Sequence, residues 1–321
     1  MKIIAEFCQN HNGDEVILNE MISMASDGGA THAKIQTIFA NDLSFRAQFE
    51  EGEVDSFGRI KTIKRPYENE YERLKKLELE YFQQEKFIQN CKSNNLIPLT
   101  TAFNILSIPH IKDLGWEIVK VASYDCSSLP LIEQLAKFFD ELIISTGATF
   151  DDEISKTALY LNKIKKKYSL LHCVTQYPTP LEEMHLNRME FLRSFTSSVG
   201  LSEHSRVSEH GVKACLAAIY LGAEIIERHF TVLPESDTRD GPVSISMKHL
   251  REIKKFLTLS KTDQWEYINT NIIEFNKMLG KKKRSLSHDE LLNRDYYRGR
   301  FCNKINGQQI FNWQESAKNI I

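Results

Sequence analysis

Short runs of apolar and β-branched residues recur along the chain, and each is followed by a segment with apolar residues three or four positions apart. The eight runs are KIIAEF (2–7), HAKIQTI (32–38), LIPLTTAF (96–103), IVKVASYD (118–125), ELIISTGA (141–148), YSLLHCVTQY (168–177), SSVGLSEH (197–204) and EIIERHFT (224–231). The segments with helical spacing include 15–27, 81–94, 129–139, 151–167, 184–195 and 211–221. This alternation predicts parallel strands joined by right-handed crossovers, and eight such units predict a closed (β/α)8 TIM barrel.

An open doubly wound sheet is the alternative fold. It is disfavoured in its dinucleotide-binding form because the glycine after the first strand occurs in HNGDE, without a GxGxxG pattern.

Two regions interrupt the alternation of predicted strands and helices. Residues 39–80 are too long and polar for a simple crossover, which indicates an excursion at the active site. We assign residues 1–262 to the barrel and 263–321 to a short C-terminal extension, in which residues 280–313 are expected to form a solvated connector rather than a nucleic-acid patch.

Composition and charge narrow the class of protein. The chain has 321 residues, is 41% hydrophobic and 26% charged, and carries a formal charge of -2, so it has no general attraction to nucleic acid or to an anionic membrane. Glu6 and Asn10 interrupt the N-terminal apolar stretch, and no later window reaches a spanning length. We expect a cytoplasmic protein. The six cysteines form no CxxC pair and are predicted to be reduced and mostly structural.

Polar residues gather at the carboxyl ends of the predicted strands, where the catalytic residues of a barrel lie. Each of the eight strands supplies at least one; the candidates include Glu6, Gln36, Thr101, Asp125, Ser145, Thr175, Tyr177, Ser202 and Glu227. A hydrogen-bonded group lining the barrel is the plain alternative for any single serine or threonine. Agreement among eight strands favours a common site.

Two lysines, Lys34 and Lys120, lie inside predicted strands. Burying an ammonium group costs several kcal/mol unless an anion accompanies it, so we expect a phosphate or carboxylate between the two. The hydroxyls of Ser123, Ser145 and Ser202 would assist in binding that anion. Structural pairing of the lysines with Glu6 or Asp125 is the alternative.

His204 and His229 end the seventh and eighth predicted strands, which are neighbours in a barrel. Two imidazoles on one rim, flanked by Glu203 and Glu227, favour a metal site with open positions for water or substrate. Imidazole ligands with few thiolates suit Mn, Fe, Co or Zn.

With these residues in view, the sequence resembles the sialic acid synthase family, whose members condense phosphoenolpyruvate with N-acetylmannosamine or related diacylamino hexoses. The resemblance covers IAEFCQNHNG (4–13), GATHAKIQT (29–37), LTTAF (99–103), KVASYDCSSLPL (120–131), IISTGA (143–148), LLHCVTQYPTPLEEMHL (170–186), GLSEHS (200–205) and LGAEIIERHFT (221–231). It spans nearly the whole barrel in order, and it implies a homodimer that forms through barrel helices.

The resemblance also implies roles for particular residues. Mn²⁺ or Mg²⁺ would bind His204 and His229 and polarise the sugar aldehyde. Glu6 would be the main acid/base or cation-stabilising carboxylate, and we take Glu6, Lys34, Lys120 and Asp125 as the catalytic set. Phosphoenolpyruvate would contact Lys34, Lys120, Ser123, Ser145, Thr175 and Ser202, while Gln36, Asp125 and Tyr177 would face the sugar.

The sequence departs from the family pattern at three places. Glu203 replaces the Asp of GLSDH, which could shift the metal or its water. ESDTRDGPVSIS (235–246) replaces GPDHxxS, and Asp240 is the nearest candidate for the acid that contacts the sugar, with Asp237 and Arg239 as competitors. About forty residues follow Gly280, too few for the antifreeze-like domain that caps the partner subunit's site in many members.

The last departure leaves a truncated or replaced antifreeze-like region. Arg298 and Arg300 could contact the acyl group of the sugar from this tail, but we expect a hairpin docked on the surface.

Two rival functions stay open. One is another phosphoenolpyruvate-dependent 3-deoxy sugar acid synthase whose phosphorylated acceptor meets basic residues of the excursion, namely Arg59, Lys61, Lys64 and Arg65. The other is a non-catalytic sugar-binding homologue.

Overall fold

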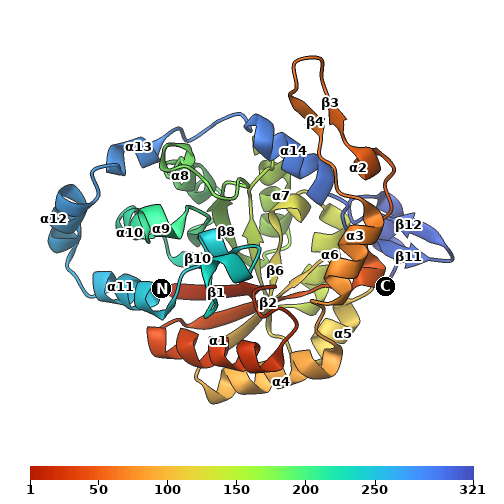
Figure 1. Ribbon diagram of the computed structural model, residues 1–321, viewed down its shortest axis with the longest axis horizontal. Helices are drawn as coiled ribbons and strands as arrows, with labels where there is room; N and C mark the ends of the chain where they lie inside the picture. The colour runs from red at the N-terminus through yellow and green to blue at the C-terminus, as the bar shows by residue number, and fades with distance from the viewer.

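A computed structural model describes residues 1–321 and contains a closed barrel of eight parallel strands, which confirms the predicted fold (Figure 1). Consecutive strands of the barrel are neighbours, and the last pairs with the first. The strands are β1 (Lys2–Cys8), β2 (His32–Thr37), β5 (Ile97–Ala102), β6 (Ile118–Val121), β7 (Glu141–Ser145), β8 (Lys167–Cys173), β9 (Val199–Glu203) and β10 (Ile225–His229). Each of the eight predicted runs overlaps one of them, with β1 and β8 each extending one residue beyond its run.

Helices surround the barrel in the order that the apolar spacing predicts (Figure 1). They are α1 (Glu15–Gly28), α4 (Tyr81–Ser93), α5 (Ile108–Asp113), α6 (Leu129–Phe138), α7 (Asp151–Lys163), α8 (Arg188–Arg193), α10 (Lys213–Tyr220) and α11 (Met247–Leu257). Local capping sets some of their ends. Asp14 accepts from the backbone N–H of Val16 at 2.6 Å at the start of α1, and Gly29, with φ of 90°, ends the helix.

The predicted helix at 184–195 is shorter in the structure because its first residues pair with a later segment of the chain. The N–H groups of Leu186 and Asn187 donate to the carbonyls of Met278 and Leu279, each at 2.8 Å. His185 has a φ of 46°, which no helix allows. Tertiary backbone pairing therefore replaces the first helical turn.

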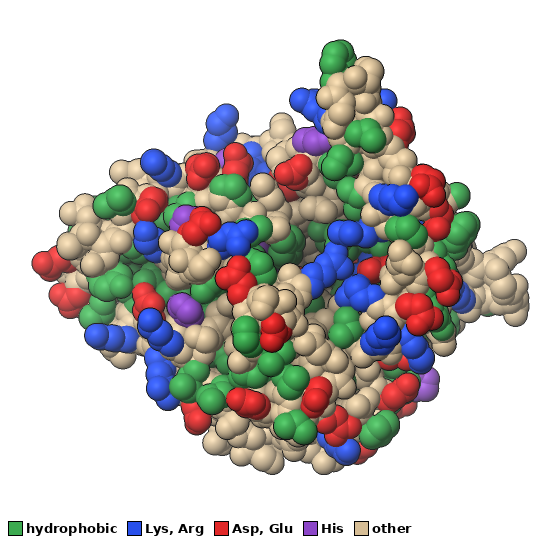
Figure 2. Space-filling view, viewed as in Figure 1, with side chains coloured by type: hydrophobic (Ala, Val, Ile, Leu, Met, Phe, Trp, Pro, Cys, Tyr) green, Lys and Arg blue, Asp and Glu red, His purple; other side chains and the backbone are tan.

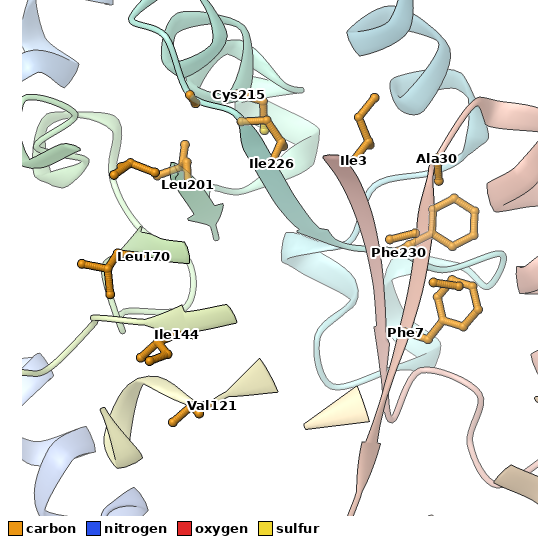
Figure 3. Close-up of a cluster of buried hydrophobic side chains, with 14 of the residues drawn as sticks. Ile3, Phe7, Ala30, Val121, Ile144, Leu170, Leu201, Cys215, Ile226 and Phe230 are labelled. Atoms are coloured by element: carbon orange, nitrogen blue, oxygen red, sulfur yellow. The ribbon is translucent and has the colours of Figure 1, made fainter. Parts of the chain in front are cut away.

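Alternation along the strands separates two layers of side chains. Outward-facing residues pack under the helices, and Figure 3 shows Ile3 and Phe7 of β1 and Leu201 of β9 in this layer. A smaller apolar cluster fills the barrel interior toward the amino ends of the strands; it consists of Ile4, Leu99, Ile143, Leu171 and Ile225. The interior toward the carboxyl ends is polar.

The excursion between β2 and β5 begins with η1 (Ala40–Asp42) and contains α2 (Gln48–Glu51), the hairpin β3 (Glu53–Val54) and β4 (Ile60–Thr62), and α3 (Tyr67–Lys75). The hairpin projects away from the barrel, whereas α3 lies beside the barrel (Figure 1). Lys61 and Lys64 pair with Glu53 and Glu51 on the exposed part of the excursion.

The C-terminal extension folds into α12 (Lys261–Asn271), α13 (Phe275–Leu279), α14 (His288–Tyr297) and the hairpin β11 (Asn303–Ile305) and β12 (Gln308–Ile310). The expectation of a solvated connector over 280–313 is wrong. Glu290 is fully buried and receives two hydrogen bonds from Arg284, at 2.5 and 2.7 Å. The Asn303 side chain accepts from the N–H of Ile105 at 2.8 Å. These hydrogen bonds offset the free-energy cost of burying charged and polar groups, and they hold the extension on the barrel.

The division of the chain at residue 262 stays a prediction. The structure contains no helix that is both long enough and apolar enough to cross a membrane. Short 3₁₀ turns and small helices complete the loops, among them η2 (Ser123–Asp125), η3 (Leu181–Glu183), α9 (Val207–His210), η4 (Glu235–Asp237), η5 (Gly241–Val243) and η6 (Glu315–Asn319).

Candidate active site

A cavity of about 390 Å³ opens at the carboxyl ends of the barrel strands. Its size is in the range of small-molecule sites. It is lined by all the predicted site residues except Thr175, namely Glu6, Lys34, Gln36, Lys120, Ser123, Asp125, Ser145, Tyr177, Ser202, His204, His229 and Asp240. The barrel therefore gathers residues that are up to 234 positions apart in the sequence.

Thr175 does not line the cavity, and its predicted role in substrate binding stays a prediction. It is fully buried, and its carbonyl accepts a hydrogen bond from Asn293 at 2.8 Å. Its methyl carbon lies so near Gly147 that a Cβ added there would approach it to 2.6 Å. Thr175 thus packs behind the loop that follows β7.

Side chains of one face of the barrel strands form a polar layer at the base of the cavity. Their spacing follows the period of two along a strand. The layer consists of Glu6, Lys34, Thr101, Lys120, Ser145, Cys173, Ser202 and Glu227. The Oγ of Ser145 is buried without a hydrogen-bond partner, so it is available to a ligand.

Both predicted lysines are buried and both are paired with carboxylates. Lys34 contacts Glu6 directly and lies 3.9 Å from Glu227, and the Lys120 Nζ is 2.5 Å from the Glu227 Oε1. Glu227 thus lies between the two lysines, and the binding of a substrate phosphate or carboxylate there stays a prediction. The alternative of structural pairing holds for Lys34 with Glu6, whereas Lys120 pairs with Glu227 and not with Asp125. A cavity nevertheless opens between them.

The charges in this layer shift one another's pKa. Burial alone would raise the pKa of the Glu227 carboxyl, but the ammonium groups of Lys120 and Lys34 outweigh it and the pKa falls to about 2. Ser202 also donates to Glu227 at 2.9 Å. Burial and the charge of Lys120 lower the pKa of Lys34 to about 7, and Glu227 opposes them.

The two predicted metal ligands lie side by side. The ring centroids of His204 and His229 are 5.3 Å apart, and the Tyr177 ring is 4.2 Å from His204. Burial lowers the pKa of both imidazoles, which keeps them neutral, as metal ligands must be. The Nδ1 of His229 is buried without a hydrogen bond, 3.5 Å from an Asp240 oxygen. This donor set fits a divalent cation.

Glu203 does not belong to this site, which corrects the expectation that it flanks the metal. It points out of the barrel, contacts Arg228 and accepts from the Ser205 N–H at 2.5 Å. The reason is the strand period of two, since Ser202 and His204 face inward. The replacement of Asp by Glu here therefore concerns the packing behind the barrel.

Asp125 meets the C-terminal extension inside the site. It accepts hydrogen bonds from Ser128 at 2.8 Å and from the Asn312 side chain at 3.1 Å. Burial raises the pKa of the Asp125 carboxyl, and these two donors act in the opposite direction.

Helix α14 lies near β4 and α7 in Figure 1, and it contributes to the lining of the cavity from within the same chain. Asn293 and Tyr297 of this helix and Arg300 after it line the cavity. The expectation that the tail is only a surface hairpin is therefore wrong, because β11 and β12 form such a hairpin but the preceding residues reach the site. Arg298 turns away, 3.6 Å from Glu153 and over the Trp313 ring.

Four arginines line the mouth of the cavity: Arg65, Arg73, Arg239 and Arg300. Glu70 binds Arg73 through two hydrogen bonds of 3.0 Å and also contacts Arg300. Figure 2 shows basic side chains gathered over and beside α3 on this face. The mouth carries more positive than negative charge, which favours anionic ligands.

Several lining residues were missed from the sequence. Cys8 and Cys173 each lie two positions from a predicted site residue, Glu6 and Thr175, so the period of two could have found them. Arg73 and Tyr297 come from segments outside the barrel pattern. No local signal in the sequence places them at the site.

The fold and the cavity define a class, that of (β/α)8-barrel proteins with a polar site at the carboxyl ends of the strands. Within this class, residues 21–263 match the family model described as the NeuB family. The chain belongs to the NeuB family, which agrees with the resemblance found in the sequence.

Named relatives and a solved structure are similar over most of their length. An N,N'-diacetyllegionaminic acid synthase of Campylobacter jejuni is 32% identical, over 84% of this chain and 82% of the relative. A pseudaminic acid synthase of Campylobacter jejuni is 25% identical, over 99% of this chain and 86% of the relative. The crystal structure of an N-acetylneuraminic acid (sialic acid) synthetase from Leptospira borgpetersenii, in complex with citrate, has a TM-score of 0.67 and 26% identity, covering 92% of this chain and 91% of that chain.

Proposed function

We propose that this protein condenses phosphoenolpyruvate with an N-acylated hexosamine of the N-acetylmannosamine type, giving a nine-carbon sugar acid of the sialic acid type and inorganic phosphate. One observation carries the proposal: two buried ammonium groups, of Lys34 and Lys120, face the same cavity as the imidazoles of His204 and His229. Membership of a family whose relatives are named as synthases of such acids supports it.

The bonds change in three places. C3 of phosphoenolpyruvate forms a bond to the aldehyde carbon of the open-chain sugar, and the aldehyde oxygen takes up a proton. Water adds to C2 and gives up a proton. The bond between C2 and the bridging oxygen then breaks, and the remaining C2 hydroxyl becomes the keto group by losing its proton. Phosphate leaves with the bridging oxygen and takes up that proton.

The residues of the polar layer suit these changes. Lys34 and Lys120 would bind the phosphate and carboxylate groups of phosphoenolpyruvate, with Ser123, Ser145 and Ser202 as hydroxyl donors. Their carboxylate partners offset the cost of burying the ammonium groups before the substrate arrives.

Glu6 lies against Lys34 at the base of the cavity and would stabilise positive charge that develops at C2. Gln36, Asp125, Tyr177 and Asp240 lie on the cavity wall and would contact the sugar. A divalent cation on His204 and His229, Mn²⁺ or Mg²⁺ by family resemblance, would polarise the sugar aldehyde.

A test supplies phosphoenolpyruvate, Mn²⁺ and N-acylated mannosamine-type sugars together and measures phosphate release, with mass spectrometry of the product. We expect release that needs all three and that is lost in His229→Ala. Sugar binding by calorimetry without turnover across a panel of sugars would instead support a non-catalytic sugar-binding homologue.

The arginines at the mouth favour one variant of this function, in which the acceptor itself carries an anionic group such as a phosphate. Of the four basic residues of the excursion, Arg65 lines the cavity, whereas Arg59, Lys61 and Lys64 do not. The test compares kcat/KM for free and phosphorylated acceptors in wild type and in Arg239→Gln, with Arg59→Gln as the control. A preference for the phosphorylated acceptor that Arg239→Gln removes would support this variant, and a preference for free sugar would contradict it.

We also propose that the protein acts in the cytoplasm as a homodimer, without nucleic-acid or membrane partners. The formal charge of -2 and the family resemblance support this. Light scattering on the purified chain tests the dimer, and a monomer at micromolar concentration would contradict it.

A further inference from the structure

Cys8 occupies an unusual position at the end of β1. It is a non-glycine residue with a φ of 49°, and the pairing register between β1 and β2 shifts between Glu6 and Cys8. The Cys8 N–H donates to a Glu6 oxygen at 2.6 Å, which holds the backbone in this conformation. A left-handed conformation costs a cysteine about 1 kcal/mol or more and persists where the surrounding structure enforces it. The bulge turns Cys8 into the lining of the cavity.

The Cys8 thiol lies among potential metal ligands. Its Sγ, a His229 ring nitrogen and an Asp240 oxygen all lie within 4.8 Å of one another. Two ligands of one ion are at most about 4.6 Å apart when each is about 2.0–2.3 Å from it, so a small contraction would bring all three atoms onto one cation.

A second observation points to a ligand at the same place. The His229 Nδ1 is buried and has no hydrogen-bond partner, and the residue as a whole is only 8% exposed. The Asp240 carboxylate is 3.5 Å from this nitrogen, which is longer than a good hydrogen bond. Buried polar atoms are almost always partnered, so the orphaned nitrogen marks a position that a ligand completes.

We propose that Cys8 and Asp240 bind the same divalent cation as His229, so that the metal site of this protein contains a thiolate. His204, the other predicted ligand, lies on the adjacent strand outside this three-residue cluster, with its ring centroid 5.3 Å from that of His229. This proposal rests on the proposed function and deepens it, because a thiolate ligand changes which metal ion the site prefers. A soft thiolate ligand favours Co²⁺, Zn²⁺ or Fe²⁺ over Mg²⁺, which prefers oxygen ligands.

The pocket offers a matched control. Cys173 also lines the cavity, and its Sγ lies 3.9 Å from the His204 Nδ1. It stands beside the other imidazole and outside the cluster that Cys8 forms. Cys8→Ser and Cys173→Ser make the same chemical change on opposite sides of the histidine pair.

The experiment titrates Co²⁺ into the metal-free full-length chain and records the near-ultraviolet charge-transfer absorption that a thiolate bound to Co²⁺ produces. We expect the band in wild type and in Cys173→Ser, and its loss in Cys8→Ser. Calorimetry should show Zn²⁺ affinity at least tenfold weaker in Cys8→Ser, with little change for Mg²⁺. Circular dichroism of the metal-free variants checks that they fold, and Cys8→Gly, which accommodates the φ of 49°, is a second variant without the thiol.

Three results would overturn the assignment. They are a band that persists in Cys8→Ser, a band lost only in Cys173→Ser, and Co²⁺ that binds wild type without a band or does not bind at all. None of these measurements requires turnover. Absence of phosphate release from a protein that shows the thiolate band would count against the proposed function alone.

Discussion

The Lys120 ammonium lies 2.5 Å from the Glu227 carboxylate inside the barrel, although the two residues are 107 positions apart. The same carboxylate is 3.9 Å from Lys34, which contacts Glu6. Two ammonium groups and two carboxylates thus occupy one layer, where each charge offsets the cost of burying another. The charges of the layer compensate one another without a bound substrate, and both lysines still line the cavity.

Lys120→Met should destabilise the fold by about 3–5 kcal/mol, because it leaves Glu227 as a buried charge with a weaker partner. The double variant Lys120→Met/Glu227→Gln should recover most of this loss while phosphate release stays abolished. Urea unfolding and the phosphate assay measure the two effects. Recovery of both stability and activity would show that Lys120 is only structural.

Glu203→Gln should destabilise the fold by about 3–5 kcal/mol, since it leaves the buried Arg228 without its carboxylate. The affinity for Co²⁺ or Zn²⁺ should change less than threefold, because Glu203 points away from the cavity. Glu203→Asp keeps the charge and serves as the control. A tenfold loss of metal affinity at unchanged stability would contradict the outward orientation.

Asn312→Ala should raise the pKa of Asp125 further, because it removes one of the two donors that oppose the effect of burial. If ionised Asp125 acts on the sugar, activity is lost as the pH falls through this pKa. The acidic limb of the kcat/KM profile should then move up by about one pH unit. Gln309→Ala in the adjacent strand β12 is the control, and an equal shift there would argue against a role of Asn312.

His172 should make the fold sensitive to acid. Burial lowers the pKa of this imidazole from 6.5 to about 3, and its Nε2 is 2.6 Å from the Met184 carbonyl. Between pH 6.5 and pH 3 the unfolded chain therefore binds a proton that the folded chain does not, and stability falls as the pH falls.

From pH 7 to pH 5 this residue should account for a loss of about 2 kcal/mol. Urea unfolding at both pH values should show that loss in wild type and a smaller one, by that amount, in His172→Gln. His110→Gln, at an exposed position, controls for the removal of a histidine. An unchanged difference between the two pH values in His172→Gln would show that His172 is not the cause.

The sequence by itself determined the barrel and most of the site. Strands such as 225–229 and helices such as 129–138 follow from the local spacing of apolar residues. Burial of one face gives these residues a period of two in a strand and of nearly four in a helix. Parallel strands that close into a barrel must bring their carboxyl ends together. His204, His229 and the two lysines could therefore be assigned to one rim before any coordinates were known.

Only the tertiary structure decided which carboxylate each lysine binds, that Glu203 faces outward, and that α14 contributes to the lining of the cavity. The pairing of charged side chains inside a barrel depends on the stagger between its strands. An extension such as 288–303 docks through contacts such as that of Asn303 with Ile105, which produce no periodic pattern in the sequence. The left-handed backbone of Cys8 likewise arises from a bulge between two strands. Such features depend on residues distant in sequence, so local patterns carry no record of them.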